Sequence, residues 1–138
     1  MQASLSMAKA TNIVEFPKKD AWEIEWNRCK HWIAKAIKHQ DSYTLDDIED
    51  KIRHGLFHLW PAERSAMVTE FVVFPQNTAL NLLFCGGDYK ELEEMLPSIE
   101  AFAKAAGCKR LYGGGRKGWL RKLKHLGFEP EYMIRKDL

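Results

Sequence analysis

The chain has 138 residues, of which 46% are hydrophobic and 29% are charged, a composition that is typical of a folded globular protein and excludes a wholly disordered one. The formal net charge of +2 is too small to indicate a nucleic-acid partner by itself. No apolar run approaches the ~20 residues of a membrane-spanning helix, and residues 1–10 do not have the pattern of an export signal. We therefore expect an N-terminal arm of residues 1–19 and a single domain of residues 20–138.

The cysteines predict reduced thiols. Cys29, Cys85 and Cys108 are odd in number, widely spaced and set among apolar neighbours. This usage favours buried structural thiols in a cytoplasmic protein over disulfides. No Cys-x-x-Cys pair supports a metal site, and we expect no bound metal.

Two helices are predicted before the first strand. The first begins at Asp20. Its apolar face recurs at helical spacing through Trp22, Trp26, Cys29, Ile33 and Ile37. A polar break at residues 40–42 precedes Thr44, which has Asp47 three positions on, close to the pattern of a capping box. Gly55 ends this second, shorter helix.

Three strands follow, because the sequence changes to short runs of aliphatic and aromatic residues separated by proline and glycine. These runs are residues 56–60, 66–74 and 79–85, and residues 76–78 form the hairpin turn between the last two. Three consecutive strands joined by short turns predict a sheet that is antiparallel in this part.

A helix and a strand come next. Asp88 begins the helix with Glu91 at its third position, again the layout of a capping box, and Pro97 either kinks this helix or starts a new one. Gly107 ends the helix, because a residue without Cβ tolerates the left-handed conformation there. A short strand is predicted at residues 110–112.

The remaining residues predict a glycine-rich turn, a basic amphipathic helix and a further strand. Residues 113–115 are all glycine. The inward face of the helix is Trp119, Leu120, Leu123 and Leu126. Gly127 ends this helix, and residues 129–134 form the strand.

This order of elements resembles the GNAT superfamily of acyl-CoA-dependent N-acyltransferases. Residues 99–128, ending in Leu-Gly-Phe, carry most of the likeness, and residues 56–134 can be aligned with the fold as a whole. Residues 59–70, LWPAERSAMVTE, also look like a run found in small GNAT-like proteins of tailed bacteriophages and prophages. The resemblance implies an α/β fold with a mixed, mostly antiparallel sheet and helices on both faces.

The resemblance also implies a site for acetyl-CoA. The family holds the CoA pyrophosphate on backbone N–H groups in an Arg/Gln-x-x-Gly-x-Gly/Ala loop at a helix N-terminus, where free amides and the helix dipole favour an anion. In this chain Cys85, Gly86, Gly87 and Lys90 stand at the matching place, without the leading Arg or Gln and with Asp88 among them. The alternative is a plain strand-to-helix turn. Arg116, in the basic stretch, is a further candidate contact for a CoA phosphate.

The catalytic residues of the family are matched less well. The tyrosine that often protonates the departing CoA thiolate is replaced by Leu123, and Arg116 stands where an asparagine often precedes the same helix. Glu70 is the candidate general base, because on a strand it would lie beside Val68 and Val72, and burial there would raise its pKa. The alternatives are an ion pair with a neighbour such as Arg64 or a position facing water.

We therefore expect a phage- or prophage-type acetyltransferase-like protein that, if active, transfers an acetyl group from acetyl-CoA to an amine. The alternative is an inactive GNAT-fold protein that binds other proteins, such as phage proteins, or forms part of a virion. Nucleic-acid binding by the basic residues between 109 and 125 is disfavoured, because the aromatic residues among them are predicted to face inward. The expected location is the cytoplasm of a bacterial host, or the virion.

Overall fold

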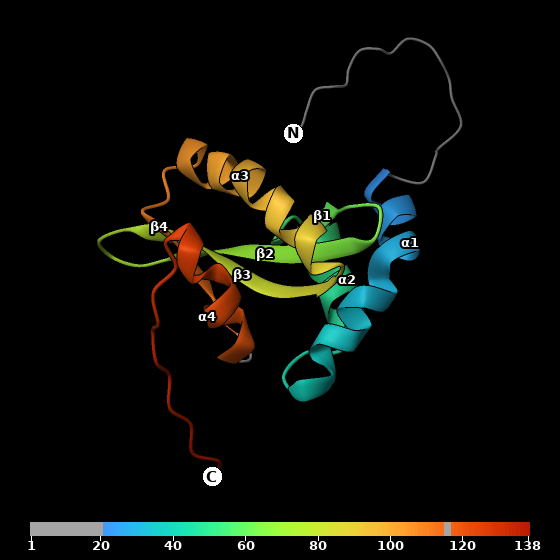
Figure 1. Ribbon diagram of the computed structural model, residues 1–138. Coiled ribbons are helices and arrows are strands. Elements are labelled where there is room, and N and C mark those ends of the chain that lie inside the picture. Colours follow the sequence, from blue (N-terminus) through green and yellow to red (C-terminus); the bar gives the residue numbers. More distant parts are fainter. Residues whose placement is uncertain (1–20, 115–116) are drawn as a thin grey trace.

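The structure of the protein is a computed structural model that describes residues 21–114 and 117–138. Its centre is a four-stranded sheet with the order β1-β2-β3-β4 (Figure 1). The strands are β1 (Phe57–Pro61), β2 (Ser65–Val73), β3 (Thr78–Gly87) and β4 (Arg110–Gly113). The first three are antiparallel neighbours, and β4 runs parallel to β3. The predicted N-terminal arm and Arg116 lie outside the described residues.

Helices cover both faces of the sheet (Figure 1). One face, here the α1 face, carries α1 (Ala21–Ala36), the 3-10 helix η2 (Ile37–His39) and α2 (Leu45–Arg53). The other, the α3 face, carries α3 (Tyr89–Ala105), α4 (Lys117–Leu123) and the 3-10 helix η3 (Lys124–Leu126). Neighbouring residues of β2 alternate between the two cores, since Val68 packs with Trp26 under α1 and Met67 packs with Leu92 under α3. The mixed, mostly antiparallel sheet with helices on both faces is as predicted.

The helix boundaries follow the local sequence. The predicted capping box of α2 is confirmed: the Asp47 N–H donates to Thr44 Oγ1 at 3.2 Å, and the Thr44 N–H donates to the Asp47 carboxylate at 2.8 Å. Pro97 lies inside α3, which the structure gives as one helix. Gly107 and Gly127 have φ of +82° and +92°, the left-handed conformation expected at these two helix ends.

The strand predicted at residues 129–134 is not formed. This segment has no regular secondary structure, and its apolar side chains Tyr132, Met133 and Ile134 are exposed. A strand exists only with a partner, and the prediction was wrong because no neighbouring strand of the described chain pairs with this segment. β4 is consequently an edge strand of the sheet.

One irregularity of β3 matters for the site. The register between β2 and β3 shifts opposite Leu83, which has no partner on β2, and Leu83 and Phe84 both pack toward the core under α1. The pairing with β4 ends at the same level, where Gly113 lies opposite Leu82. β3 therefore continues through Leu83–Gly87 with β2 on one side and no strand of the described chain on the other. We call this segment the open edge of β3.

Candidate functional site

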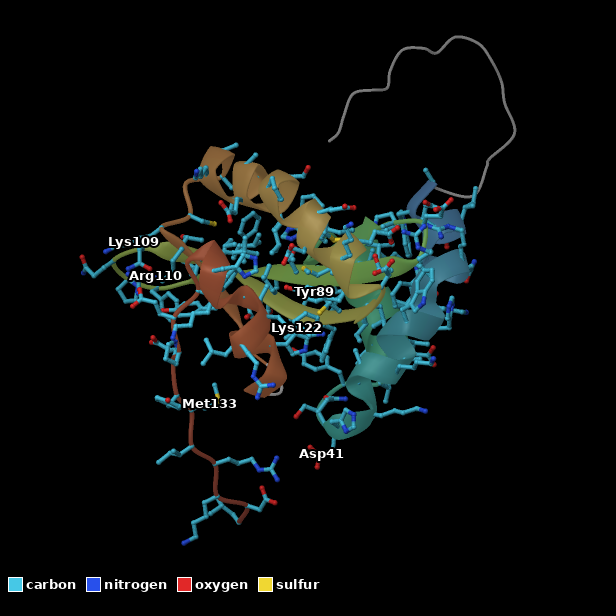
Figure 2. All side chains as sticks on the ribbon, viewed as in Figure 1. Asp41, Tyr89, Lys109, Arg110, Lys122 and Met133 are labelled. Atoms are coloured by element: carbon cyan, nitrogen blue, oxygen red, sulfur yellow. The ribbon has the colours of Figure 1, made fainter. Side chains whose placement is uncertain are left out.

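The open edge of β3 ends at Gly87, directly before α3, and α4 lies on the same face of the sheet as α3 (Figure 1). Tyr89, at the start of α3, connects the two helices: its ring lies 5.6 Å from the ring of Trp119, and Lys122 Nζ lies 4.5 Å from its ring centre (Figure 2). The Tyr89 hydroxyl donates to the Glu93 carboxylate at 2.8 Å. Burial, then the hydrogen bond to Glu93 and the negative charge of that carboxylate, raise the pKa of Tyr89 to about 12, so this phenol stays protonated.

The two glycines at the end of β3 are required by close packing. A Cβ on Gly86 would collide with the backbone carbonyl of Trp32 in α1. Gly87 has a φ of +106°, and a Cβ there would collide with the carbonyl of Arg64. The Gly-Gly pair that the family resemblance assigned to cofactor binding therefore also has a structural role, which is to let α1 and the β1–β2 turn approach β3.

The N-terminus of α3 is occupied by a carboxylate of the chain itself. Asp88 accepts a hydrogen bond from the Lys90 N–H at 3.0 Å, and its own N–H donates to the Arg64 carbonyl at 3.0 Å. Arg64 Nε lies 3.2 Å from the Asp88 carboxylate, and this contact holds the pKa of Asp88 below its usual range. An external anion would have to compete with Asp88 for these amides.

Glu91 does not complete a capping box with Asp88, contrary to the prediction. Its carboxylate accepts from the backbone N–H of Arg64 at 2.8 Å and from the hydroxyl of the buried Ser65. The Ser65 hydrogen bond, followed by that of the Arg64 backbone, lowers the pKa of Glu91. Glu91 thus fastens the start of β2 to the first turn of α3, a long-range contact that local spacing does not reveal.

Glu70 lies on β2, on the α1 face, beyond the part that α1 covers. Its neighbours across the sheet are Phe57 on β1 and Asn81 on β3. Glu70 is half-buried, and the Asn81 side-chain amide donates to its carboxylate at 2.9 Å. The alternative partner Arg64 pairs instead with Glu63, Asp88 and Glu91. The carboxylate is therefore oriented by an amide and is not neutralised by that arginine.

Two tyrosines extend this polar group. Tyr112 of β4 lies opposite Asn81, so that Glu70, Asn81 and Tyr112 form a row across three strands on one face. Tyr43, in the connection between η2 and α2, packs its ring 5.6 Å from that of Phe84. Burial, and then the charge of Glu70, raise the pKa of Tyr43. We call Tyr43, Glu70, Asn81 and Tyr112 the Glu70 cluster.

The structure brings some of the predicted site residues together and separates others. Cys85, Gly86, Gly87 and Lys90 lie at the end of β3 and the start of α3. Gly86 pairs with Ala66, and Glu70 lies four residues farther along β2, about 13 Å away at the usual rise of a strand. The open edge of β3 connects these two groups of residues. It begins next to the row of Glu70, Asn81 and Tyr112, and it ends at Gly86 and Gly87.

Cys85 faces the core under α3, and burial raises the pKa of its thiol to about 11. The thiol is therefore protonated at neutral pH, which disfavours a role as a nucleophile. Lys90 is exposed on the first turn of α3. Arg116 lies outside the described residues, so its predicted contact with a CoA phosphate stays a prediction.

Sequence reasoning missed Tyr43 and Asn81. The sequence does contain a signal for Asn81. It is the one polar residue in the run Ala79-Leu80-Asn81-Leu82-Leu83, on a strand otherwise suited to burial. Nothing in the local pattern marked Tyr43. It reaches the cluster because α1 and α2 pack side by side on the same face of the sheet.

A second polar group lies on the α3 face, where aromatic side chains enclose it. Trp60 Nε1 donates to Thr69 Oγ1 at 2.9 Å, and His58 Nδ1 lies 2.9 Å from the same oxygen. Thr69 is fully buried, and the His58 ring lies 4.7 Å from Phe71 and 5.0 Å from Phe102. Burial lowers the pKa of His58. This group joins β1 to β2 and has no room for a reactant at the threonine.

Comparison with known proteins identifies the fold. No described protein family and no curated protein sequence matched the chain. Among solved structures, it is similar to the TTHA1254 protein of Thermus thermophilus, with a TM-score of 0.59 and 17% identity over 84% of this chain and 91% of that one for a point mutant. A Trypanosoma brucei acetyltransferase aligns with a TM-score of 0.56 and 12% identity over 77% and 88% of the two chains.

The fold is GNAT-like. The α/β architecture expected from the sequence is thereby confirmed, and an acetyltransferase is among the proteins that share it. Within the described residues no helix is long and apolar enough to cross a bilayer. The same residues hold no group of three or more His, Cys, Asp or Glu side chains arranged for a metal ion.

Proposed function

We propose that the protein binds an acyl-CoA thioester along the open edge of β3 and transfers the acyl group, acetyl in the first instance, to an amine. The observation that carries the proposal is the position of Glu70 and Asn81, which lie beside the point where β3 and β4 stop pairing. A carboxylate oriented by an amide, beside the level at which two strands of a GNAT-like sheet stop pairing, is placed to accept a proton from an attacking amine.

The open edge supplies the means of binding an extended ligand. The backbone groups of Leu83–Gly87 that face away from β2 have no strand to pair with in the described chain. The amides of the pantetheine arm of CoA could hydrogen bond to them as an added strand would. The phosphates would then come near α3 and α4, where Lys90 and Lys122 are exposed, with Asp88 opposing them.

The chemistry requires few groups. The amine nitrogen bonds to the thioester carbonyl carbon as the carbon–sulfur bond breaks, the amine proton passes to Glu70, and the electron pair of the broken bond leaves on the CoA sulfur. A thiol has a pKa near 8.5, so the departing thiolate needs little help from an acid and takes its proton from solvent. The leucine at position 123, where a tyrosine is common in the family, is compatible with this scheme.

A second candidate function is an interaction protein, in a phage or a prophage-bearing cell, that keeps the fold without the reaction. The observation in its favour is Asp88, whose carboxylate occupies the amides that a CoA pyrophosphate would use. Under this proposal the exposed surfaces of the protein bind other proteins, and the Glu70 cluster has no reactant.

Isothermal titration with acetyl-CoA separates the two proposals. Binding in the micromolar range is expected for the acyltransferase, and no heat at millimolar ligand would contradict it. An assay of free CoA release with a panel of small amines then tests the reaction. Glu70→Gln should bind acetyl-CoA as the parent protein does and release little CoA.

A further inference from the structure

The segment after Gly127 has an unusual surface. Tyr132, Met133 and Ile134 are consecutive and are 90%, 94% and 95% exposed. They lie in residues 129–138, which we call the C-terminal tail and which have no regular secondary structure. Figure 2 shows Met133 on the tail, clear of the sheet. Single exposed apolar residues are common in soluble proteins, but three adjacent large ones with no packing mark a surface that is covered in use.

The outer edge of β4 is also unpaired. The Phe74 N–H donates to the Asn77 carbonyl at 2.8 Å, so the backbone groups of Ala79 face β2 and those of Leu80 face β4. Leu80 pairs in parallel with Leu111, a register that turns the backbone groups of Arg110 and Tyr112 toward β3 and those of Leu111 and Gly113 away from it. No strand within residues 21–114 and 117–138 pairs with them. An edge of this kind is a template for another strand.

The tail and the edge are complementary. Tyr132, Met133 and Ile134 suit a strand, and the tail has no regular structure of its own that pairing would disrupt. Glu129 and Glu131 precede the apolar residues, whereas the exposed side chains at the start of β4 are Lys109 and Arg110 (Figure 2). Backbone pairing, apolar burial and opposite charge would therefore act together.

We propose that the C-terminal tail of one copy pairs with the outer edge of β4 in a second copy, and that the exchange is reciprocal and forms a dimer. A second copy is the occupant because the tail of the same chain runs away from its own sheet (Figure 1) and leaves its own edge free. Each sheet gains a fifth strand, and the two interfaces are equivalent by symmetry.

The exchange also bears on the Glu70 cluster. The row formed by Glu70, Asn81 and Tyr112 ends at β4, and a strand paired with β4 continues the row by one position. The partner copy therefore supplies the side of the cluster beyond Tyr112. The proposal does not require catalysis, since the same dimer would form in an interaction protein.

Sedimentation equilibrium of the full chain tests the proposal. A dimer is expected in the micromolar range. Replacing both Met133 and Ile134 by Asp should weaken it by about tenfold or more, since it removes apolar burial and adds charge. Asp137→Asn, in the same tail, is the matched control and should leave the dimer intact. A parent protein that is monomeric throughout this range, or a dimer unaffected by the double replacement, would overturn the proposal.

A substitution on the edge gives an independent test. Gly113→Pro removes an N–H that points outward and leaves the ladder with β3 intact, because an edge strand tolerates proline where its nitrogen faces away from the sheet and Gly113 has no positive φ. It should weaken the dimer without changing the circular dichroism spectrum. Hydrogen exchange should show protected amides in residues 131–135 of the dimer. Protection of these amides in a monomer would place the tail on its own sheet and would also overturn the proposal.

Discussion

The two ends of the open edge of β3 differ in how their polar groups are used. At the α3 end, Asp88 and Glu91 pair with Arg64 and with backbone amides, so the groups that could hold an anion are engaged. At the other end, Glu70 has an amide partner in Asn81 and lies on a part of the sheet that α1 does not cover. The same strand thus joins a closed region, which stabilises the fold, to an open one, where chemistry is possible.

The two ends of this edge therefore differ in how open their polar groups are to a ligand. The GNAT-like sheet is present and β3 and β4 stop pairing at Leu82 and Gly113, whereas the turn at Gly86 and Gly87 is closely packed. Three substitutions, taken from the largest expected effect to the smallest, test whether the two regions are as different as their contacts indicate, and a fourth tests the group around His58.

Glu70→Gln tests the open region. If Glu70 is the base, the rate of acetyl transfer should fall by roughly 10²- to 10⁴-fold while the affinity for acetyl-CoA is unchanged, because the amide is isosteric and cannot accept the proton. Single-turnover release of CoA measures the first quantity and calorimetry the second. Glu94→Gln, exposed on α3, is the matched control. An unchanged rate would remove Glu70 from the mechanism.

Gly86→Ala tests the closed region. The new methyl group would meet the backbone of Trp32, which cannot move without displacing α1, so the free energy of unfolding should fall by about 3 kcal/mol. Gly114→Ala is the control, since no atom lies within 4 Å of its Cβ position. Urea denaturation followed by circular dichroism measures both. Equal stability of the two variants would show that the turn is less tightly packed than described.

Asp88→Asn connects the two regions. The amide still caps α3 but no longer carries the charge that opposes a phosphate, so the affinity for acetyl-CoA should rise several-fold if the phosphates approach this helix. Calorimetry at low ionic strength gives the result most clearly, because salt screens the effect. Lys90→Gln should change the affinity in the opposite direction. A phosphate group held elsewhere would leave both affinities unaltered.

The closed group around His58 predicts a dependence of stability on pH. Because burial lowers the pKa of His58 in the folded protein, the folded state binds fewer protons than the unfolded state near pH 6. The stabilisation is complete above the unfolded pKa of about 6.5 and is lost as the pH falls through the lower, folded value. Urea midpoints measured across this range should show the loss.

The control for this effect is His39, an exposed histidine on η2. His58→Phe should flatten the dependence on pH between the two pKa values, whereas His39→Gln should leave it as in the parent protein. A slope that survives His58→Phe would assign the proton to another group.

The sequence predicted those features that depend on neighbours along the chain. Thr44 with Asp47 specified the start of α2, and Gly107 and Gly127 specified two helix ends. Strand alternation also placed Glu70 on the same face as Val68, which packs under α1 in the structure. These predictions depend only on residues near each other in the sequence, and the structure confirms them.

What the sequence did not predict depends on pairs far apart in the chain. Glu91 bonds to Ser65, 26 residues away, and so leaves the predicted capping box. The bulge at Leu83 follows from the register between two strands, which no single strand encodes. Residues 129–134 have the composition of a strand but no strand partner in the described chain. The lack of a partner cannot be predicted from the local sequence pattern.

The contact between Gly86 and Trp32 limits how the protein could adapt to ligands of different size. With no space between the end of β3 and the backbone of α1, these two elements must move as one body. β3 is therefore the rigid side of the site, and its open edge cannot move independently of α1. If the open edge binds an acyl chain as proposed, any adjustment to a longer or bulkier chain has to come from the opposite side, where β4 pairs with β3 over four residues and α4 packs through Trp119 and Leu123. Substrate range would accordingly be tuned by mutations in α4, with the sheet left as it is.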